Sequence, residues 1–443
     1  MGGRSWTSTE VANALGVPAP AMLTFSAIST DTRHLTPGTL FLALKGDRFD
    51  AHDFLGQAKA AGATAAVVRR GTPPVPGLPY FEVQDTLAAL GLLARARRRR
   101  LPTGSPVVAI TGSSGKTSTK EMIRAALATR WRVHATTGNL NNLVGVPLTI
   151  LGAPEDTEAL VIEAGASVPG EIARLRDIIE PTIAVITNVG PAHVEGFGSL
   201  EGVMREKLAL LERVPAAVVG PGPEGMLDAA RKMTEVSIGK ELGEDAMLDA
   251  CLDEEGRPQL PLEGGGAVSL PVVGLHQLEN ALIALAVAEQ VGIDHDAAVR
   301  ALVGVRLPAG RGELRQVGGL TLIDDSYNAN PASLRRAVQF AHWLARKKGR
   351  PLAVVVGTML ELGRESARLH AEAAREIVAR KPALIAAVGE FVPAFAALGQ
   401  RIIAAPDAEA LGPKLRTALA GNEIVLLKAS RGVALERALR HLT

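Results

Sequence analysis

The sequence lacks several features that would by themselves suggest a location or a partner. It has one cysteine, Cys251, so no disulfide can form within the chain, which fits a reducing compartment. No run of about 18 or more apolar residues occurs, and the opening MGGRSWTSTE has no apolar core typical of a signal peptide. We therefore expect a cytoplasmic protein with no stable membrane insertion.

Neither sign of charge dominates. Lys and Arg number 48 and Asp and Glu number 46, and the net charge of +2 gives no bulk reason to expect binding to nucleic acid or membranes. A local exception is the basic run from Arg95 to Arg100, which contains no aromatic residue. We expect a solvated helix end here rather than a patch for anionic partners. Zinc-binding Cys/His spacing and the G-x-S-x-G motif are also missing from the sequence.

The length and composition indicate a globular protein of several domains. The 443 residues are 47% hydrophobic, enough for two to four domains with their own cores. Strand-like runs alternate with helical patterns, which predicts an α/β protein with parallel sheets. We place three segments at residues 1–83, 84–307 and 308–443.

The stretch VVAITGSSGKTST, residues 107–119, has the order of a phosphate-binding loop. A buried strand leads into a turn of small residues (Gly112, Ser113, Ser114 and Gly115), and a helix opens at Lys116. Backbone N–H groups and the helix dipole attract phosphate at such a turn. Lys116 would reach the β- and γ-phosphates, and Thr117 or Ser118 would hold Mg²⁺. Ile110 stands where the usual pattern has a glycine, and an ordinary Gly/Ser turn is the alternative.

Two polar clusters lie on predicted loops. The first, Ser29, Asp31, Thr32 and Arg33, suits a ligand with hydroxyl and phosphate groups. The second, Asn139, Asn141 and Asn142, suits a ligand rich in amides or sugars, because asparagine both donates and accepts. Simple surface turns would look similar in both places.

Further candidates follow predicted strands or lie on helices of the middle segment. Glu163 ends a strand, where a carboxylate is well placed for a metal ion. His193 follows the next strand and would bind Mg²⁺ or polarise a phosphate, unless it is a loop histidine without a role. Lys207 reads by default as a surface lysine. His276 and Asn280 share one helix face, where they would flank a base or cap the helix.

The last segment opens with a predicted hairpin, ELRQV-GG-LTLIDD, which leads into the polar loop DDSYNANP, residues 324–331. Four strand-like runs then alternate with helices, which predicts a doubly wound domain. Polar residues gather after the first and last of these runs, at 357–363 and 428–432. Ligands of such sheets bind at the carboxyl ends of the strands.

Together these motifs resemble those of the Mur ligases, from Ser29 to Gly432. The residues that carry the resemblance are TGSSGKTSTKE (111–121), TGNLNNLVGVPLT (137–149), ITNVGPAHVEGFGS (186–199), DDSYNANP (324–331) and GTMLELG (357–363). The family fold implies a small N-terminal α/β domain that binds uridine, a central ATPase domain with a P-loop, and a C-terminal Rossmann-like domain that receives the amine and closes over the site.

The resemblance also implies roles for particular residues. Lys116, His193 and Lys207 would be catalytic, and Thr117 or Ser118, Glu163 and His193 would serve the metal ions. Asn280, Arg311 and Asp325 would contact the nucleotide, while Tyr327, Asn328 and Asn330 would lie near the adenine or the incoming amine. Relatives often carry Lys-Gly-Glu where Lys207 is followed here by Leu208 and Ala209. A carbamylated Lys207 that bridges metals is therefore an open expectation. Which of Asp324 and Asp325 contacts the nucleotide is also left open.

The last two motifs indicate the final ligase of the series. The implied activity uses ATP and Mg²⁺ to join D-alanyl-D-alanine to UDP-N-acetylmuramoyl-tripeptide through an acyl phosphate, in peptidoglycan precursor synthesis. The alternatives are a sister ligase for another amino acid or a folate-type substrate, a P-loop ATPase that drives motion, and a non-enzymatic nucleotide-binding scaffold. We expect a monomer.

Overall fold

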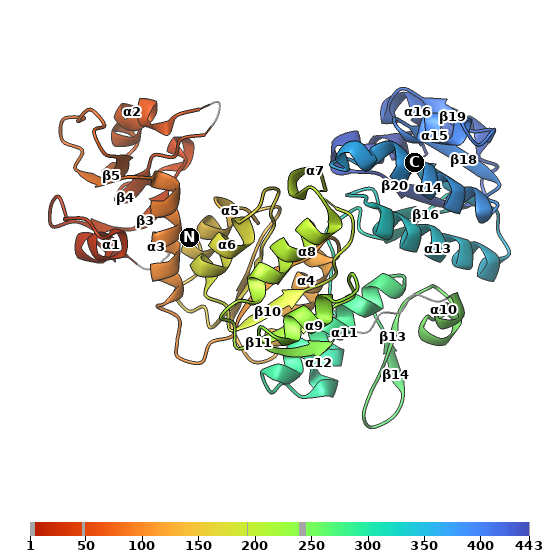
Figure 1. Cartoon of the computed structure of the whole chain (residues 1–443), viewed down its shortest axis with the longest axis horizontal. Coiled ribbons are helices and arrows are strands. Elements are labelled where there is room, and N and C mark those ends of the chain that lie inside the picture. The colour runs from red at the N-terminus through yellow and green to blue at the C-terminus, as the bar shows by residue number, and fades with distance from the viewer. Residues whose placement is uncertain (1–4, 47–48, 193, 239–244, 443) are drawn as a thin grey trace. The chain divides into compact units, whose positions relative to one another are not determined.

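The computed structural model describes residues 5–442 except for 47–48, 193 and 239–244. The protein is α/β, as the sequence predicts, with helices and strands alternating along most of the chain (Figure 1). One compact unit comprises the described residues up to Ile110 with 130–166 and 170–184. The other comprises 111–129, 167–169 and the described residues from Val185 onwards. Each of the three predicted segments holds one main sheet, and their boundaries after residues 83 and 307 stay a prediction.

The first sheet has four parallel strands in the order β3-β4-β5-β6. Its alternating side chains form two cores, so that Leu40 and Leu42 pack on one face and Phe41 and Ala43 on the other. The elements of this region are β1 (Trp6–Thr7), α1 (Ser8–Leu15), β2 (Thr24–Phe25), β3 (Ala27–Ser29), β4 (Thr39–Leu42), α2 (Leu55–Ala60), β5 (Ala63–Arg69), β6 (Tyr80–Val83) and α3 (Thr86–Arg98).

The basic run at the end of α3 binds protein groups rather than solvent alone. Arg97 is 4% exposed and donates to the carbonyl oxygens of Ala153 and Pro154 at 2.9 and 2.8 Å. The Arg100 guanidinium lies 3.7 Å from the centre of the Trp6 ring. The expectation of a solvated helix end is therefore wrong for Arg97, because its donors satisfy carbonyl groups beyond the end of a neighbouring helix.

The central sheet has six strands in the order β12-β11-β10-β7-β9-β8. Pairs β7–β9, β8–β9 and β11–β12 are parallel, and the β7–β9 register sets Ile110 opposite Glu163. The strands are β7 (Val107–Thr111), β8 (Val133–Ala135), β9 (Ala159–Glu163), β10 (Ile183–Ile186), β11 (Ala216–Val219) and β12 (Glu235–Ile238). The nearby hairpin pairs β13 (Gln259–Pro261) with β14 (Ala267–Ser269).

The helices of this region are α4 (Lys116–Leu127), α5 (Gly145–Leu151), α6 (Glu171–Ile179), α7 (Val194–Phe197), α8 (Leu200–Leu208), α9 (Met226–Arg231), α10 (Asp245–Cys251), α11 (Leu275–Gln290) and α12 (His295–Leu302). Helix α11 is buried along most of its length and packs against α4. The two helices therefore support the turn that precedes α4.

The third sheet has the order β15-β16-β20-β17-β18-β19, with β15–β16 antiparallel and the other pairs parallel. The predicted hairpin is confirmed. Alternate strand residues such as Leu322, Val355 and Val425 share a core with α16, and α13 lies against β20 and β17 (Figure 1). The elements are β15 (Glu313–Val317), β16 (Leu320–Asp324), α13 (Pro331–Lys348), β17 (Leu352–Val356), α14 (Ser366–Ala379), β18 (Leu384–Val388), α15 (Phe391–Ala396), β19 (Ile403–Ala405), α16 (Ala408–Ala418) and β20 (Ile424–Lys428).

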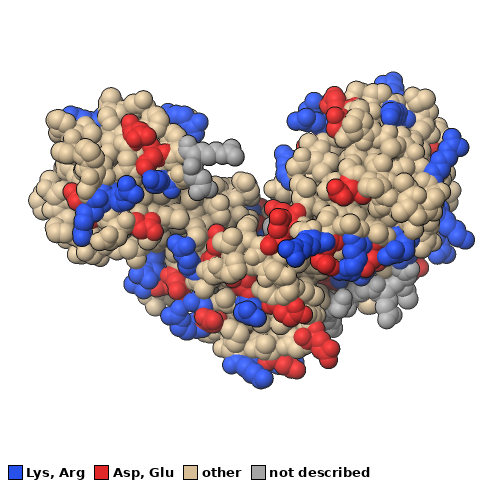
Figure 2. Space-filling view, turned by 45° about the horizontal axis from the view of Figure 1, so that its top comes forward, with Lys and Arg blue, Asp and Glu red and all other residues tan. Residues whose placement is uncertain are grey.

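Charged side chains of both signs are interspersed on the surface in Figure 2, in keeping with the net charge of +2. Among the helices formed by the described residues, none combines the length and apolar character that crossing a membrane requires.

Candidate active site

The turn between β7 and α4 depends on two glycines. Gly112 has φ of 148°, and a Cβ added there would lie 1.9 Å from Oγ1 of Thr187. Gly115 has φ of 79°, and its added Cβ would lie 2.6 Å from Oδ1 of Asn280. Only glycine accepts both the positive φ and the close neighbours. The strand, turn and helix therefore have the arrangement that the sequence predicts.

Asn188 braces this turn from the end of the neighbouring strand. Its side-chain oxygen accepts from the backbone N–H of Ser114 at 3.1 Å, and its carbonyl oxygen accepts from that of Ser113 at 3.0 Å. The Ser113 hydroxyl donates to the Gly190 carbonyl at 2.9 Å. Sequence reasoning gave Asn188 no role, although a polar residue directly after a predicted strand was the available signal.

Lys116 begins α4 and folds back over the turn. Its Nζ donates to the Gly112 carbonyl oxygen at 2.8 Å, so the ammonium lies above the loop rather than extending into solvent. Thr117 and Ser118 are 5% and 4% exposed in the first helical turn. The first N–H groups of a helix have no acceptor within the helix, and its dipole favours an anion there. The geometry is suited to hold phosphate groups.

Asn280 projects from α11 beside this loop. Its Oδ1 accepts from the Thr119 hydroxyl at 3.1 Å, and its Nδ2 donates to Oε1 of Gln277 at 3.0 Å. His276 lies one turn earlier, with an Nδ1 that is buried and has no hydrogen-bond partner within the described part of the chain. Burial, aided by neighbouring positive charges, lowers the pKa of His276 to about 3, so its imidazole is neutral at pH 7.

Glu163, the last residue of β9, is 4% exposed. Its backbone N–H donates to the Thr136 hydroxyl at 2.9 Å, and its Oε1 accepts from the Asn141 side chain at 3.0 Å. The carboxylate is therefore oriented by the asparagine loop. Asn141 lay in the cluster that the sequence singled out for a ligand rich in amides or sugars, but its contact with Glu163 was not predicted.

The other two asparagines of that cluster are exposed and shape the loop. Oδ1 of Asn142 accepts from the backbone N–H groups of Val144 and Gly145 at 3.1 and 2.8 Å. The Asn139 carbonyl accepts from the N–H of Asn141 at 2.8 Å. These contacts give both residues a turn-forming role, and their contact with a ligand stays a prediction.

The remaining candidates for the metal site are His193 and Lys207. His193 lies outside the described residues. Lys207 is 1% exposed on α8, with Nζ 5.8 Å from the centre of the Phe197 ring, so it is not the surface lysine of the default interpretation. Within the described ranges, no three or more His, Cys, Asp or Glu side chains form a group that could hold a metal ion. Mg²⁺ commonly uses one or two carboxylates with substrate phosphates, so this does not conflict with a Mg²⁺ site.

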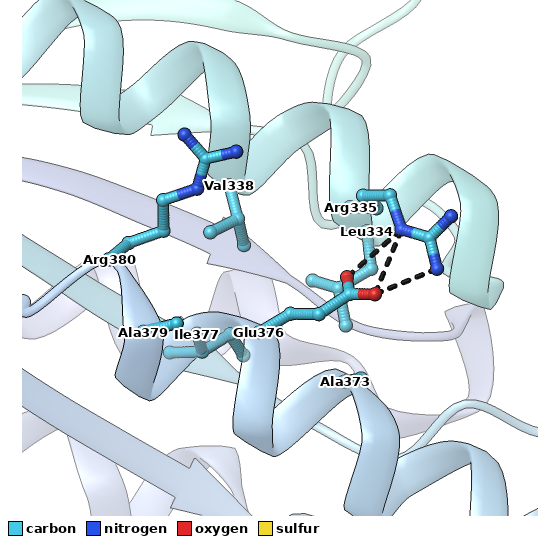
Figure 3. A pocket seen from close by; sticks show the side chains of 8 residues that line it. All are labelled: Leu334, Arg335, Val338, Ala373, Glu376, Ile377, Ala379 and Arg380. Carbon is cyan, nitrogen blue, oxygen red and sulfur yellow. Dashed lines mark hydrogen bonds and ion pairs between the residues drawn. The ribbon is translucent and has the colours of Figure 1, made fainter.

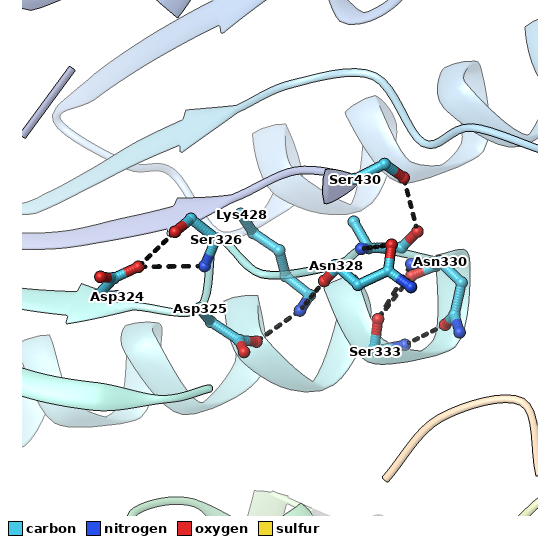
Figure 4. A network of polar contacts seen from close by, with 9 residues as sticks. Asp324, Asp325, Ser326, Asn328, Asn330, Ser333, Lys428 and Ser430 are labelled. Atoms are coloured by element: carbon cyan, nitrogen blue, oxygen red, sulfur yellow. Dashed lines mark hydrogen bonds and ion pairs between the residues drawn. The ribbon is translucent and has the colours of Figure 1, made fainter. Parts of the chain in front are cut away.

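The polar loop after β16 is organised around Lys428 at the end of β20 (Figure 4). Its Nζ donates to Oδ2 of Asp325 at 2.5 Å and to the Asn328 carbonyl at 3.0 Å. Asp324 instead accepts from the N–H and hydroxyl of Ser326 at 3.2 and 2.6 Å. Burial raises the pKa of Asp325, and the Lys428 ammonium opposes that shift. Asp324 thus shapes the turn. Lys428 lay in the polar stretch 428–432 that the sequence singled out, but its pairing with Asp325 was not predicted, because the two residues are remote in sequence.

Two more predicted residues flank this loop. The Arg311 guanidinium lies 4.0 Å from the centre of the Tyr327 ring, in cation–π contact. Asn330 caps α13 by accepting from the Ser333 N–H at 2.9 Å, and its Nδ2 donates to the Ser113 carbonyl of the phosphate loop at 3.3 Å. Their contacts with a nucleotide or an amine stay predictions.

The polar turn of the first unit is held by its own side chains. Asp31 pairs with Arg33 at 2.7 Å, and the Ser29 hydroxyl accepts from the Asp31 N–H at 3.1 Å. The hydrogen bond with Arg33 holds the pKa of Asp31 far below its usual range. Thr32 begins the short helical turn that Asp31 caps. A ligand role for these four residues stays a prediction.

A groove of about 310 Å³ between α13 and α14 is a separate feature (Figure 3). Apolar side chains such as Leu334, Val338 and Ile377 line it, and Arg335 and Glu376 form an ion pair of 2.7 Å at its edge. None of the predicted site residues lines this groove. The phosphate loop therefore stays the candidate active site.

The strand, glycine turn and helix with its lysine define a phosphate-binding α/β protein. Three family models match the chain: the Mur ligase family catalytic domain at 24–98, the Mur ligase middle domain at 110–288, and the Mur ligase glutamate ligase domain at 310–431. A UDP-N-acetylmuramoyl-tripeptide–D-alanyl-D-alanine ligase of Bacillus subtilis is 35% identical over 98% of this chain and 96% of its own. The chain therefore belongs to the Mur ligase family.

Solved structures agree with this assignment. A crystal structure of MurF from Acinetobacter baumannii is 31% identical, covers 99% of both chains and has a TM-score of 0.86. The MurF ligase of Thermotoga maritima in complex with ADP is 28% identical, covers 94% of this chain and 96% of its own, and has a TM-score of 0.82. The similarity therefore extends over all three sheets.

Proposed function

We propose that this protein is an ATP-dependent ligase that joins D-alanyl-D-alanine to UDP-N-acetylmuramoyl-tripeptide in peptidoglycan precursor synthesis. The products are UDP-N-acetylmuramoyl-pentapeptide, ADP and phosphate. The observation that carries the proposal is the phosphate loop, with Lys116 folded over Gly112 at the start of α4, in a chain that matches named ligases of this kind over nearly its full length.

The reaction needs activation because a carboxylate is a poor electrophile. The terminal carboxylate oxygen of the tripeptide attacks the γ-phosphorus of ATP, and ADP leaves. The amine nitrogen of D-alanyl-D-alanine then attacks the carbonyl carbon of the acyl phosphate. Phosphate leaves with the C–O bonding pair, and the nitrogen loses its proton. The protein contributes mainly by positioning the reactants and neutralising charge.

The proposed residues suit these tasks. Lys116 and the first N–H groups of α4 offset the negative charge of the transferring phosphoryl group. The hydroxyl of Thr117 or Ser118 and the carboxylate of Glu163 are hard oxygen donors of the kind that Mg²⁺ prefers, and His193 completes the proposed set. Mg²⁺ supplies further charge neutralisation when it is bound. A carbamylated Lys207 remains part of the proposal.

The other predicted residues are assigned by segment. The first, 1–83, binds the uridine diphosphate through Ser29, Asp31, Thr32 and Arg33. The second, 84–307, binds ATP, and its Asn139 and Asn142 contact the substrate. In the third, 308–443, Arg311 and Asp325 contact the nucleotide, as does Asn280 of the second segment. Tyr327, Asn328 and Asn330 lie near the adenine or the dipeptide. We propose a monomer.

The test is phosphate release from ATP and Mg²⁺ with each partner omitted in turn. The full mixture contains UDP-N-acetylmuramoyl-tripeptide and D-alanyl-D-alanine, and the control replaces the dipeptide with single amino acids. Release that requires both substrates, with formation of the pentapeptide, is expected. Release with a single amino acid but not the dipeptide would move the protein to a sister step. Release that ignores both substrates would contradict the ligase assignment.

A further inference from the structure

We infer that Asn141 is a positioning residue that holds Glu163 in the orientation needed to bind Mg²⁺. The inference deepens the proposed function and rests on it for the identity of the ion. The observation that carries it is the hydrogen bond of 3.0 Å from Asn141 Nδ2 to Oε1 of Glu163, a residue that is 4% exposed.

Asn141 is itself fixed by its backbone. Its carbonyl oxygen accepts from the N–H of Gly165 at 2.7 Å, and its own N–H donates to the Asn139 carbonyl at 2.8 Å. The loop that holds Asn141 is thereby joined to Gly165, two residues after Glu163. These two hydrogen bonds hold the backbone of Asn141 in place. Its side-chain amide reaches the Glu163 carboxylate from this held backbone.

Gly165 makes this close approach feasible. A Cβ added to Gly165 would lie 3.1 Å from both Cγ and Nδ2 of Asn141, which is tighter than ordinary contact. A side chain at 165 would therefore require Asn141 to shift by a few tenths of an ångström. Glycine at position 165 thus leaves room for the side-chain amide of Asn141.

The chemistry at this position favours an amide. A carboxylate accepts hydrogen bonds only, so Oε1 needs a donor, and the NH₂ group supplies one without adding charge. A fixed Oε1 limits rotation of the carboxylate and thus directs its other oxygen. Partners that orient metal ligands typically contribute about 10–100-fold to metal affinity. We expect an effect of that size for Asn141.

The experiment measures ADP binding by titration calorimetry while Mg²⁺ is varied, using the intact protein. Asn141→Ala should raise the Mg²⁺ concentration at half-effect by about 10-fold or more. ADP affinity without Mg²⁺ should stay unchanged, because the phosphate loop does not depend on Asn141. The matched control is Asn13→Ala, an exposed position on α1 in the same unit, which should leave both quantities unchanged.

A second variant, Asn141→Leu, keeps most of the side-chain volume but has no hydrogen-bond donor. It should raise the Mg²⁺ concentration at half-effect about as much as Asn141→Ala does, again with unchanged ADP affinity in the absence of Mg²⁺. This variant serves if Asn141→Ala fails to fold.

A Mg²⁺ requirement within about twofold of the parent protein in Asn141→Ala or in Asn141→Leu would overturn the inference while leaving the ligase assignment intact. If Mg²⁺ fails to tighten ADP binding even in the parent protein, the metal assignment falls, and the role of Asn141 falls with it.

Discussion

Lys428→Met should destabilise the protein strongly, by roughly 3–5 kcal/mol. The Lys428 side chain is 3% exposed, and that of its partner Asp325 is 17% exposed. Removing the ammonium leaves a largely buried carboxylate without its counter-ion and the Asn328 carbonyl without its donor. Methionine retains most of the aliphatic volume, so the cost reflects the lost charge rather than a cavity.

The prediction is tested by urea unfolding of four proteins: the parent, Lys428→Met, Asp325→Asn and the double variant. The double variant should be more stable than Lys428→Met alone, because no unpaired charge remains buried. Lys348→Met, at an exposed position of α13, is the matched control and should stay within about 0.5 kcal/mol of the parent. A similarly small effect for Lys428→Met, or strictly additive effects in the double variant, would refute the reasoning.

Three further predictions follow from the described contacts. Lys116→Ala should lower turnover by about 10²-fold or more, and near-normal phosphate release with both substrates present would refute its role. The pKa of His276 is about 3 in the fold against 6.5 for the free side chain. As the pH falls below 6.5, His276 takes up a proton in the unfolded chain before it does so in the fold, so stability present above pH 6.5 is lost toward pH 3. His276→Gln should therefore weaken the pH dependence of the urea midpoint. An equal slope in the variant and the parent protein would contradict this prediction. Arg97→Met should cost about 1.5 kcal/mol or more, because two carbonyl groups lose a charged donor, and an unchanged thermal midpoint would count against this account.

The sequence predicts those parts of the fold that local patterns determine. The buried strand, the glycine turn and the helix from Lys116 appear in the predicted order, because apolar runs and glycine act over a few residues. The hairpin of β15 and β16 follows for the same reason. The position of Glu163 at a strand end also follows from the alternation of strands and helices.

The contacts that fix the site are mostly not local. Lys428 and Asp325 are 103 residues apart, and the Ser114–Asn188 contact joins residues 74 apart. Their meeting depends on strand order, which local periodicity does not contain. The same holds for Arg97, whose partners are 56 and 57 residues away. The sequence of the run from Arg95 to Arg100 therefore predicted a solvated helix end, although Arg97 is buried.

Asp324 ends β16 and Asp325 follows it, and the sequence does not show which of them faces the candidate site. Successive side chains at a strand end point in opposite directions. Asp324 turns toward Ser326, and Asp325 turns toward Lys428. Both are acidic and adjacent, so composition and spacing do not distinguish them.

The central claim is that the tripeptide carboxylate is activated by phosphoryl transfer. The most direct measurement is the fate of ¹⁸O placed in that carboxylate, followed by mass spectrometry of the released phosphate. The account predicts that each phosphate formed with both substrates present carries one oxygen from the carboxylate, because the acyl C–O bond breaks when the amine attacks. Unlabelled phosphate would mean that ATP is hydrolysed by water, and it would contradict the ligase mechanism.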